Sequence, residues 1–322
     1  MIVAHDTADP QPISGTIQIG EVEITHLSNA GFFFMCGEKK ILIDALFRRE
    51  EIPAEISLAV FGKIQKGLPP FDGIDMALAT HAHGDHFDPY SAGKFLENNP
   101  EAIFISHNEA RLLFEQEFSG FDEIQDRVVT VTLEKGETTE LTENGIKLRI
   151  LGMRHGGFYT GKNYGYLFEM GGLKILHMGD SLLTLSEIEV FQLSQEEIDV
   201  VFINWWYLID NKYVETVREG IKAKQVVVMH NELKNFEDKT VDIDWVLERV
   251  EAEFPDAIVF YGVPEVKEEP PGEKSLEEGT MEEGLPPEKS SEEARTEEKG
   301  YFLIIPVLII SAAIVMILLK KR

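Results

Sequence analysis

The sequence predicts an α/β domain made of two β-sheets with helices packed against them. Apolar runs separated by glycine, asparagine and proline recur along residues 21–178 and indicate strands joined by turns. From residue 200 onward, strand-like runs alternate with helical patterns, which is typical of strands connected by helices. The globular part, residues 1–262, is long enough for one large domain or two small ones.

Each predicted element follows from its local pattern. Short apolar or alternating runs indicate strands, and longer runs with apolar residues at helical spacing indicate helices. The predicted strands are residues 21–26, 32–35, 40–44, 74–80, 102–106, 127–151 with a hairpin turn at Glu143-Asn144-Gly145, 165–170, 173–178, 200–203, 226–229 and 257–260. The predicted helices are residues 51–67, 89–98, 214–222 and 245–253. The turn Ser28-Asn29-Ala30-Gly31 joins the first two strands.

The strongest chemical signal is the segment His81-Ala82-His83-Gly84-Asp85-His86, which directly follows the predicted strand 74–80. Histidine and carboxylate side chains at this density are typical of a metal site. His81 and His83 point to the same side of an extended segment and can bind one ion, while the pair beyond the bend, Asp85 and His86, can reach a second. This mixture of imidazole and carboxylate favours zinc, with iron or manganese as alternatives.

Composition excludes several classes of site and partner. Cys36 is the only cysteine, so the chain has neither a disulfide framework nor a cysteine-based zinc site, and we expect it to be a small core residue. The formal net charge is −27 at pH 7. No nucleic-acid partner is expected, because phosphate binding needs clustered lysine and arginine.

The C-terminal part of the sequence reads as a membrane anchor on a polar connector. Residues 264–300 hold thirteen glutamates against five lysines and arginines, so we expect a disordered stalk. Residues 301–319 carry no charge and would cross about 30 Å of hydrocarbon as a helix. The predicted parts are residues 1–16 as an N-terminal segment, 17–262 as the folded domain, 263–300 as an acidic linker, 301–319 as a single transmembrane helix and 320–322 as a basic tail.

The topology of this anchor stays open between two arrangements. The basic residues after the span place the C-terminus in the cytoplasm by the positive-inside rule, and therefore place the domain outside the cell membrane. Residues 1–19, however, lack both a basic start and a long apolar run, so they show no export signal. A tail-anchored domain in the cytoplasm is the alternative to the extracytoplasmic location that we favour.

Three further polar residues stand at predicted strand ends and extend the metal motif. His155 follows the strand that ends near residue 151, Asp180 ends the segment 175–180, and His230 follows the strand 226–229. A site for two ions needs more ligands than the motif provides, and these residues can provide them.

In this combination the chain resembles the metallo-β-lactamase superfamily, and within it the branch that contains L-ascorbate-6-phosphate lactonase and N-acyl-phosphatidylethanolamine phospholipase D. Five elements correspond in order: Asp44 after the second hairpin, the His-x-His-x-Asp-His motif, His155 before a glycine-rich loop, the segment that ends in Asp180 and Ser181, and the pair Met229-His230. The resemblance covers residues 17–262 and implies an αββα sandwich with the site at one edge.

The resemblance also implies a role for each residue. The first of two divalent ions would be bound by His81, His83 and His155, the second by Asp85, His86 and His230, and both by a bridging Asp180. Asp44 would orient a ligand histidine instead of binding metal, and we expect a similar supporting role for His177. We expect Asp85 to act catalytically as well, by aligning the hydroxide between the ions and moving a proton to the leaving group.

The chain departs from the family near the expected mouth of the site. Ala45 stands where the family often has proline, and the segment from Ile203 through Tyr207 replaces a proline-containing turn. The aromatic residues that would rise beside the metals are Phe158, Tyr159, Trp205, Trp206 and Tyr207. Their flat apolar faces would suit an acyl chain or a sugar ring.

These observations predict a membrane-anchored hydrolase with two metal ions, which acts on an ester, lactone, amide or phosphodiester of a small-molecule or lipid substrate. A lipid-cleaving phosphodiesterase is one alternative, favoured by the anchor. A surface-displayed binding module without turnover is the alternative from another class. The acidic surface disfavours a nuclease, and the sequence leaves no region for the electron delivery that a diiron oxidoreductase needs.

Overall fold

The computed structural model describes residues 15–48, 56–157, 159–231 and 242–261. All of them lie in the first of two structural units, residues 1–268. Within this described part, no helix combines the length and apolar character needed to cross a membrane. The predicted linker, transmembrane helix and basic tail lie outside the described residues, as do residues 1–14 of the predicted N-terminal segment.

The N-terminal strands form one mixed sheet of seven strands in the order β1-β2-β3-β4-β5-β6-β7. The first four strands pair antiparallel, and β4 to β7 pair parallel. Their bounds are Thr16–Ile19, Val22–Ser28, Gly31–Cys36, Lys39–Ile43, Met76–Leu78, Ile103–His107 and Val128–Val131 for β1 to β7. Since β2, β4 and β5 run in one direction, their carboxyl ends share an edge of the sheet.

A second mixed sheet of seven strands has the order β14-β13-β12-β11-β10-β9-β8. Strands β8 to β11 pair antiparallel, and β11 to β14 pair parallel. Their bounds are Thr138–Glu143, Ile146–Met153, Asn163–Met170, Leu173–His177, Val200–Asn204, Gln225–Met229 and Ile258–Val259 for β8 to β14. The hairpin predicted at Glu143-Asn144-Gly145 joins β8 to β9, and the strands predicted on either side of Gly171 pair as expected.

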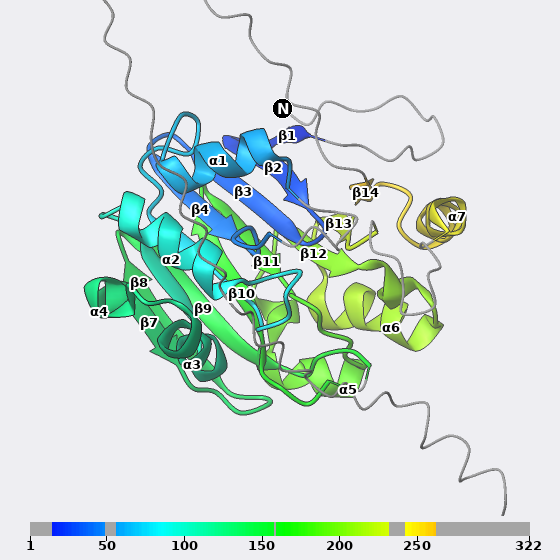
Figure 1. Cartoon of the computed structure of the whole chain (residues 1–322). Helices are drawn as coiled ribbons and strands as arrows, with labels where there is room; N and C mark the ends of the chain where they lie inside the picture. The colour runs from blue at the N-terminus through cyan, green and yellow to red at the C-terminus, as the bar shows by residue number, and fades with distance from the viewer. Residues whose placement is uncertain (1–14, 49–55, 158, 232–241, 262–322) are drawn as a thin grey trace, which may run out of the picture. The chain divides into compact units, whose positions relative to one another are not determined.

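The two sheets pack face to face, and helices cover their outer faces (Figure 1). Alternation along β3 explains the layers, because Phe32 and Phe34 join the core between the sheets whereas Phe33 packs under the helices of the first sheet. The helices on the first sheet are α1 (Leu58–Lys66), α2 (Pro89–Asn98), α3 (Asn108–Glu117) and α4 (Phe121–Ile124). Those on the second are α5 (Leu185–Ile188), α6 (Asn211–Glu215) and α7 (Ile243–Glu253). The predicted αββα arrangement is confirmed.

Several element boundaries differ from the prediction. The described part of the helix predicted at 51–67 begins only at Leu58, because Ser57 Oγ accepts a hydrogen bond from the Val60 amide and caps the helix there. The strand predicted at 74–80 pairs only over Met76–Leu78. The helix predicted at 214–222 starts at Asn211 and continues as a π-helix over Thr216–Ile221. Helix α3 was not predicted, since it buries few apolar side chains and its periodicity is weak.

Candidate metal centre

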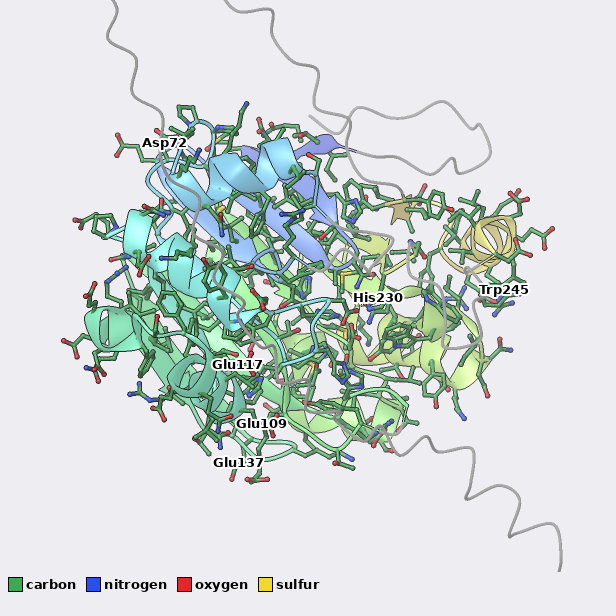
Figure 2. The ribbon with its side chains drawn as sticks, in the orientation of Figure 1. Asp72, Glu109, Glu117, Glu137, His230 and Trp245 are labelled. Atoms are coloured by element: carbon green, nitrogen blue, oxygen red, sulfur yellow. The ribbon has the colours of Figure 1, made fainter. Side chains whose placement is uncertain are left out.

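Polar residues from both sheets meet at one edge of the sandwich, where strands β4, β5, β9, β11 and β13 have their carboxyl ends. Asp44 follows β4, the segment from Thr80 to His86 follows β5, Asp180 follows β11 and His230 follows β13. His155 follows β9, which runs parallel to β11 because both pair antiparallel with β10. Side chains far apart in the chain thus converge on rigid strand ends. Figure 2 shows His230 inside the folded domain, whereas the exposed carboxylates of Asp72 and Glu137 lie at its periphery.

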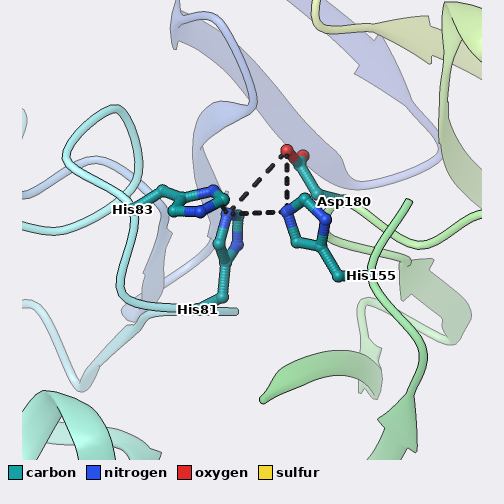
Figure 3. A group of neighbouring side chains, drawn as sticks. All are labelled: His81, His83, His155 and Asp180. Carbon is teal, nitrogen blue, oxygen red and sulfur yellow. Dashed lines mark hydrogen bonds and ion pairs between the residues drawn. The ribbon is translucent and has the colours of Figure 1, made fainter. Parts of the chain in front are cut away.

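The first cluster consists of His81, His83, His155 and Asp180 (Figure 3). His81 Nε2 lies 2.9 Å from His83 Nδ1 and 3.3 Å from His155 Nε2. Asp180 Oδ2 lies 3.8 Å from His81 Nε2 and 3.6 Å from His155 Nε2. Donor atoms bound to one ion at about 2.1 Å are separated by roughly 3.0 to 3.4 Å, so this spacing is close to that of a ligand shell.

The second cluster consists of Asp85, His86 and His230. Asp85 Oδ2 lies 3.5 Å from His86 Nε2 and 3.6 Å from His230 Nε2. Asp180 reaches this cluster too, with Oδ1 at 3.4 Å from His86 Nε2 and Oδ2 at 3.3 Å from His230 Nε2. The carboxylate of Asp180 therefore lies between the two clusters, in the position that the resemblance implies for a bridging ligand.

Asp180 is held in place by its neighbours on the second sheet. Its backbone amide donates to Asn163 Oδ1 at 3.0 Å, and its Oδ1 accepts from Asn204 Nδ2 at 3.0 Å. Gly179, directly before it, has φ of 53°, and a Cβ there would lie 2.8 Å from Thr80 Cβ. Only glycine allows the chain to turn this closely against the start of the histidine motif.

Hydrogen bonds fix which ring nitrogen faces the site in three of the histidines. Thr80 Oγ1 donates to Asp44 Oδ2 at 2.7 Å, so it accepts from His81 Nδ1 at 3.0 Å and leaves the Nε2 lone pair of His81 free. His86 Nδ1 donates to Asp44 Oδ2 at 2.8 Å. His155 Nδ1 donates to the carbonyl of Gly156, its neighbour in the chain. In each case Nε2 is the nitrogen left to act as a metal ligand.

The electric field at the second cluster favours a cation. Burial opposes the charged form of His86, but the carboxylates of Asp180, Asp85 and Asp44 outweigh it and raise the pKa of His86 well above its usual range. Burial raises the pKa of the Asp85 carboxyl, but the nearby His86 and His230 outweigh it and lower that pKa to about 2. The pKa of His81 is lowered well below its usual range, chiefly by burial, which keeps its lone pair available.

The donor set fits divalent metal ions. His86 Nε2 is buried and has no hydrogen-bond partner among the described residues, although it points at two carboxylates. A buried ring nitrogen of this kind is costly, and a cation at the cluster would satisfy it. Nitrogen and carboxylate donors in two adjacent groups would hold such ions without any cysteine.

Asp44 and His177 lie behind the clusters. Asp44 is fully buried and accepts three hydrogen bonds, from the Thr80 amide at 2.8 Å, from the Thr80 hydroxyl and from His86. His177 donates through Nε2 to the Ala30 carbonyl at 3.0 Å and accepts through Nδ1 from the Gly179 amide at 3.2 Å. Both ring nitrogens of His177 are therefore used by the backbone, and His177 shapes the turn before Asp180 without contributing a donor atom to either cluster.

The aromatic residues predicted at the mouth fall into different positions. The ring of Tyr159 lies 4.1 Å from that of His83 and 4.7 Å from that of His155, and the ring of Trp206 lies 4.8 Å from that of His230. Trp205 is half-buried and lies against Trp206 and the indole of α7, Trp245. Phe158 lies outside the described residues.

The prediction for Tyr207 is wrong. Tyr207 is fully buried, and its hydroxyl accepts a hydrogen bond from the Leu183 amide at 3.1 Å and lies 3.1 Å from Ser181 Oγ. The polar end of this ring is thus used to hold the chain just after Asp180, and the ring belongs to the core of the second sheet. Its neighbours in sequence point elsewhere because Trp205–Leu208 forms a short 3-10 helix that rotates successive side chains.

Sequence reasoning missed three residues that touch the clusters, namely Asn29, Thr80 and Asn204. Asn29 Nδ2 lies 3.1 Å from both Asp85 Oδ2 and His230 Nε2. Thr80 links Asp44 to His81. Its position directly before the histidine motif was the one feature of the sequence that could have indicated this role. Asn29 and Asn204 stand in a turn and at a strand end, where asparagine is common, so nothing in the pattern distinguished them.

Comparison with known proteins agrees with this architecture. The profile of the beta-lactamase superfamily domain matches residues 23–230. A metal-dependent hydrolase of the UPF0173 group from Pyrococcus furiosus is 25% identical over 216 residues, covering 65% of this chain and 84% of that protein. A UPF0173 metal-dependent hydrolase from Pyrococcus abyssi is 27% identical over 217 residues, with the same coverage of 65% and 84%.

Solved structures share the fold at low sequence identity. Igni18, a metallo hydrolase from Ignicoccus hospitalis, superposes with a TM-score of 0.53 at 20% identity, covering 76% of this chain and 96% of that one. An isothiocyanate hydrolase from Delia radicum gut bacteria superposes with a TM-score of 0.51 at 16% identity, covering 75% of this chain and 97% of that one.

Proposed function

The chain belongs to the metallo-β-lactamase superfamily, and on that premise we propose that its described domain is a metal-dependent hydrolase with two ions at the candidate centre. The observation that carries the proposal is the carboxylate of Asp180, which lies within 3.3 to 3.8 Å of four imidazole nitrogens from two clusters. The Pyrococcus relatives bear the name metal-dependent hydrolase, which supports the same reaction type.

The residues of the two clusters would hold the ions in the way the resemblance implies. His81, His83 and His155 would hold one ion, Asp85, His86 and His230 the other, and Asp180 both. Two imidazole-rich sites favour zinc, with manganese or iron as alternatives. When bound, such ions supply Lewis acidity and lower the pKa of water, which is the chemistry that hydrolysis of an ester, lactone, amide or phosphodiester requires.

The protein side chains would orient the attacking nucleophile and the substrate, and they would exclude bulk solvent. Asp85 is the cluster carboxylate with the most solvent contact, at 18% exposure against 6% for Asp180, so it is the one placed to align the attacking nucleophile and to take part in proton transfer to the leaving group. Tyr159 and Trp206 flank opposite clusters and present apolar ring surface beside the reacting position. This placement supports a substrate with an apolar or ring-shaped part, such as a lipid ester or a lactone.

A panel of chromogenic esters, lactones and phosphodiesters tests the proposal together with metal analysis. The purified full-length chain should carry close to two equivalents of zinc, manganese or iron, and Asp180→Asn should lose both turnover and at least one equivalent. The matched variant Asp122→Asn, at an exposed carboxylate of α4, should keep both. A folded chain that takes up no metal after loading would overturn the assignment, and full metal content without turnover on any substrate class would favour the binding module instead.

We also propose that residues 301–319 anchor the enzyme in the cell membrane, with residues 263–300 as an acidic linker and residues 17–262 as the catalytic domain outside. The support is the uncharged run followed by Lys320-Lys321-Arg322. Such an anchor would bring lipid substrates within reach and keeps a lipid-cleaving phosphodiesterase as the leading alternative. Protease treatment of intact cells decides the location: cleavage of the domain supports it, and full protection places the domain in the cytoplasm.

A further inference from the structure

Asn29 is the side chain at the second cluster that the assigned roles do not use. It is fully buried in the turn between β2 and β3. The end of its side chain lies 3.1 Å from Asp85 Oδ2 and 3.1 Å from His230 Nε2, two atoms of the cluster that would hold the second ion. Asn29 therefore touches the ligand shell directly.

The backbone pins Asn29 in this place. Its carbonyl accepts from the His230 amide at 3.2 Å and lies 3.2 Å from His26 Nε2. Two residues on, a Cβ at Gly31 would lie 2.6 Å from the Asp44 carbonyl, so the turn is pressed against the strand end that carries Asp44. The turn is thus held by a hydrogen bond to the His230 amide on one side and packs closely against Asp44 on the other.

The spacing fits a ligand that shares an ion with Asp85 and His230. Donor atoms around one ion stand roughly 3.0 to 3.4 Å apart, and the end of Asn29 is 3.1 Å from two of them at once. Asn204 provides the contrast. Its Nδ2 faces one cluster atom, Asp180 Oδ1 at 3.0 Å, and a backbone carbonyl, that of Gly179 at 3.1 Å. Two acceptors fix the amide of Asn204 with its nitrogen toward Asp180, outside the shell.

Both contacts of Asn29 Nδ2 are instead to cluster atoms, Asp85 Oδ2 and His230 Nε2, and no backbone carbonyl holds this nitrogen. The Oδ1 atoms of Asn29 and Asn204 are both buried without a hydrogen-bond partner among the described residues, so the absence of a backbone contact at Nδ2 is what distinguishes Asn29. A half-turn about the Cβ–Cγ bond places Oδ1 where Nδ2 stands. A cation at the cluster repels the amide NH₂ and attracts the amide oxygen, because only the oxygen carries lone pairs.

We propose that Asn29 binds the second ion through Oδ1, which raises the protein donors of that site to five: Asn29, Asp85, His86, Asp180 and His230. With one water the site would be six-coordinate and rich in oxygen, which suits manganese or iron better than zinc, whereas the first site, with three imidazoles and one carboxylate, keeps the tetrahedral set that suits zinc. The two sites would then differ in metal preference. This inference rests on the proposed function, since it needs an ion at the second cluster.

Titration of the metal-free full-length chain with Mn²⁺ tests the ligand, with calorimetry and metal analysis as readouts. Asn29→Gly removes the side chain yet keeps a residue that tolerates the positive φ of 37°. We expect this variant to lose at least tenfold in affinity for one equivalent and to keep the other, whereas Asn29→Asp, which supplies a carboxylate oxygen, should bind as tightly as the wild type or tighter. The control Asn144→Gly, at a turn asparagine with φ of 48°, should match the wild type.

Visible absorption of the Co²⁺-loaded chain gives a second readout of coordination number. Co²⁺ bands gain intensity as coordination falls from six to four, so Asn29→Gly should absorb more strongly per bound ion than the wild type and Asn29→Asp should not. Equal affinity and equal spectra in Asn29→Gly and wild type would overturn the inference and leave the two-ion hydrolase intact. Loss of both equivalents together in Asn29→Gly would also overturn it, since a ligand to one ion should spare the other. A wild-type chain that binds neither ion would remove the proposed function itself.

Discussion

Replacing Asp44 by asparagine should weaken both the fold and the metal centre, although Asp44 binds no ion. Its Oδ1 accepts from the Thr80 amide at 2.8 Å, and its Oδ2 accepts from the Thr80 hydroxyl at 2.7 Å and from His86 Nδ1 at 2.8 Å. An asparagine of the same shape has one acceptor end, so its NH₂ must face a donor at one of these contacts. The φ of 48° at this position adds no new strain, because asparagine tolerates the left-handed region.

The magnitude follows from what is left unpaired. The best arrangement keeps the amide oxygen toward Thr80 Oγ1 and His86 and turns the NH₂ toward the buried Thr80 amide, which then has no acceptor. One unsatisfied buried donor and two weakened charge-assisted bonds should lower the free energy of unfolding of the metal-free chain by about 2 to 4 kcal/mol. Because the hydrogen bonds that orient His86 and, through Thr80, His81 are weakened, metal affinity should fall by about 10 to 100-fold.

Urea unfolding of the metal-free chain and competition with a chelator measure the two effects. Asp75→Asn is the matched control, since Asp75 also accepts hydrogen bonds from a side chain and from a backbone amide, Lys39 Nζ and the Lys40 amide at 2.9 Å each, at a strand end away from the clusters. That variant should lose stability but keep its metal affinity. If Asp44→Asn kept its metal affinity within twofold, or if Asp75→Asn lost as much, the idea that Asp44 orients the ligand histidines would be refuted.

Two further perturbations probe the buried His107 at the end of β6 and the ring of Tyr159 at the first cluster. Burial lowers the pKa of His107 to about 4, so His107 of the unfolded chain takes up a proton as the pH falls below about 6.5, before His107 of the folded chain does. The free energy of unfolding of the wild type should therefore drop by a few kcal/mol between pH 6.5 and 4. Urea unfolding at each pH should show a shallower loss of stability in His107→Phe, and equal slopes of stability against pH in the two proteins would count against a neutral buried His107. Tyr159→Ala should raise KM about two- to tenfold while metal content holds. Tyr159→Phe loses only the hydroxyl contact to Glu109 at 3.2 Å and should resemble the wild type. Equal KM in both variants and in the exposed control Tyr90→Ala would place Tyr159 outside the substrate site.

The sequence by itself was sufficient for the layers and for the candidate ligands. Strands are short, and their apolar alternation is local, so the two sheets could be predicted from runs of a few residues. The motif from His81 to His86 is local as well, and parallel strands bring their carboxyl ends to one edge whatever fills the core. His155, Asp180 and His230 became candidate ligands through their positions at strand ends, and the resemblance to a known family placed them beside the motif, although they lie far along the chain.

The tertiary structure decided which of the surrounding polar and aromatic side chains reach the centre. Tyr207 and Trp206 are neighbours in the chain, yet one is buried against Leu183 and the other lies against His230, because a turn of 3-10 helix rotates them apart. Asn29 is 56 residues from Asp85 and 201 residues from His230, and only the packing of the turn between β2 and β3 against the segments that follow β5 and β13 brings the three together. Contacts of this kind depend on the distances between segments, and a local pattern in one segment carries no information about the side chain that another segment places opposite it.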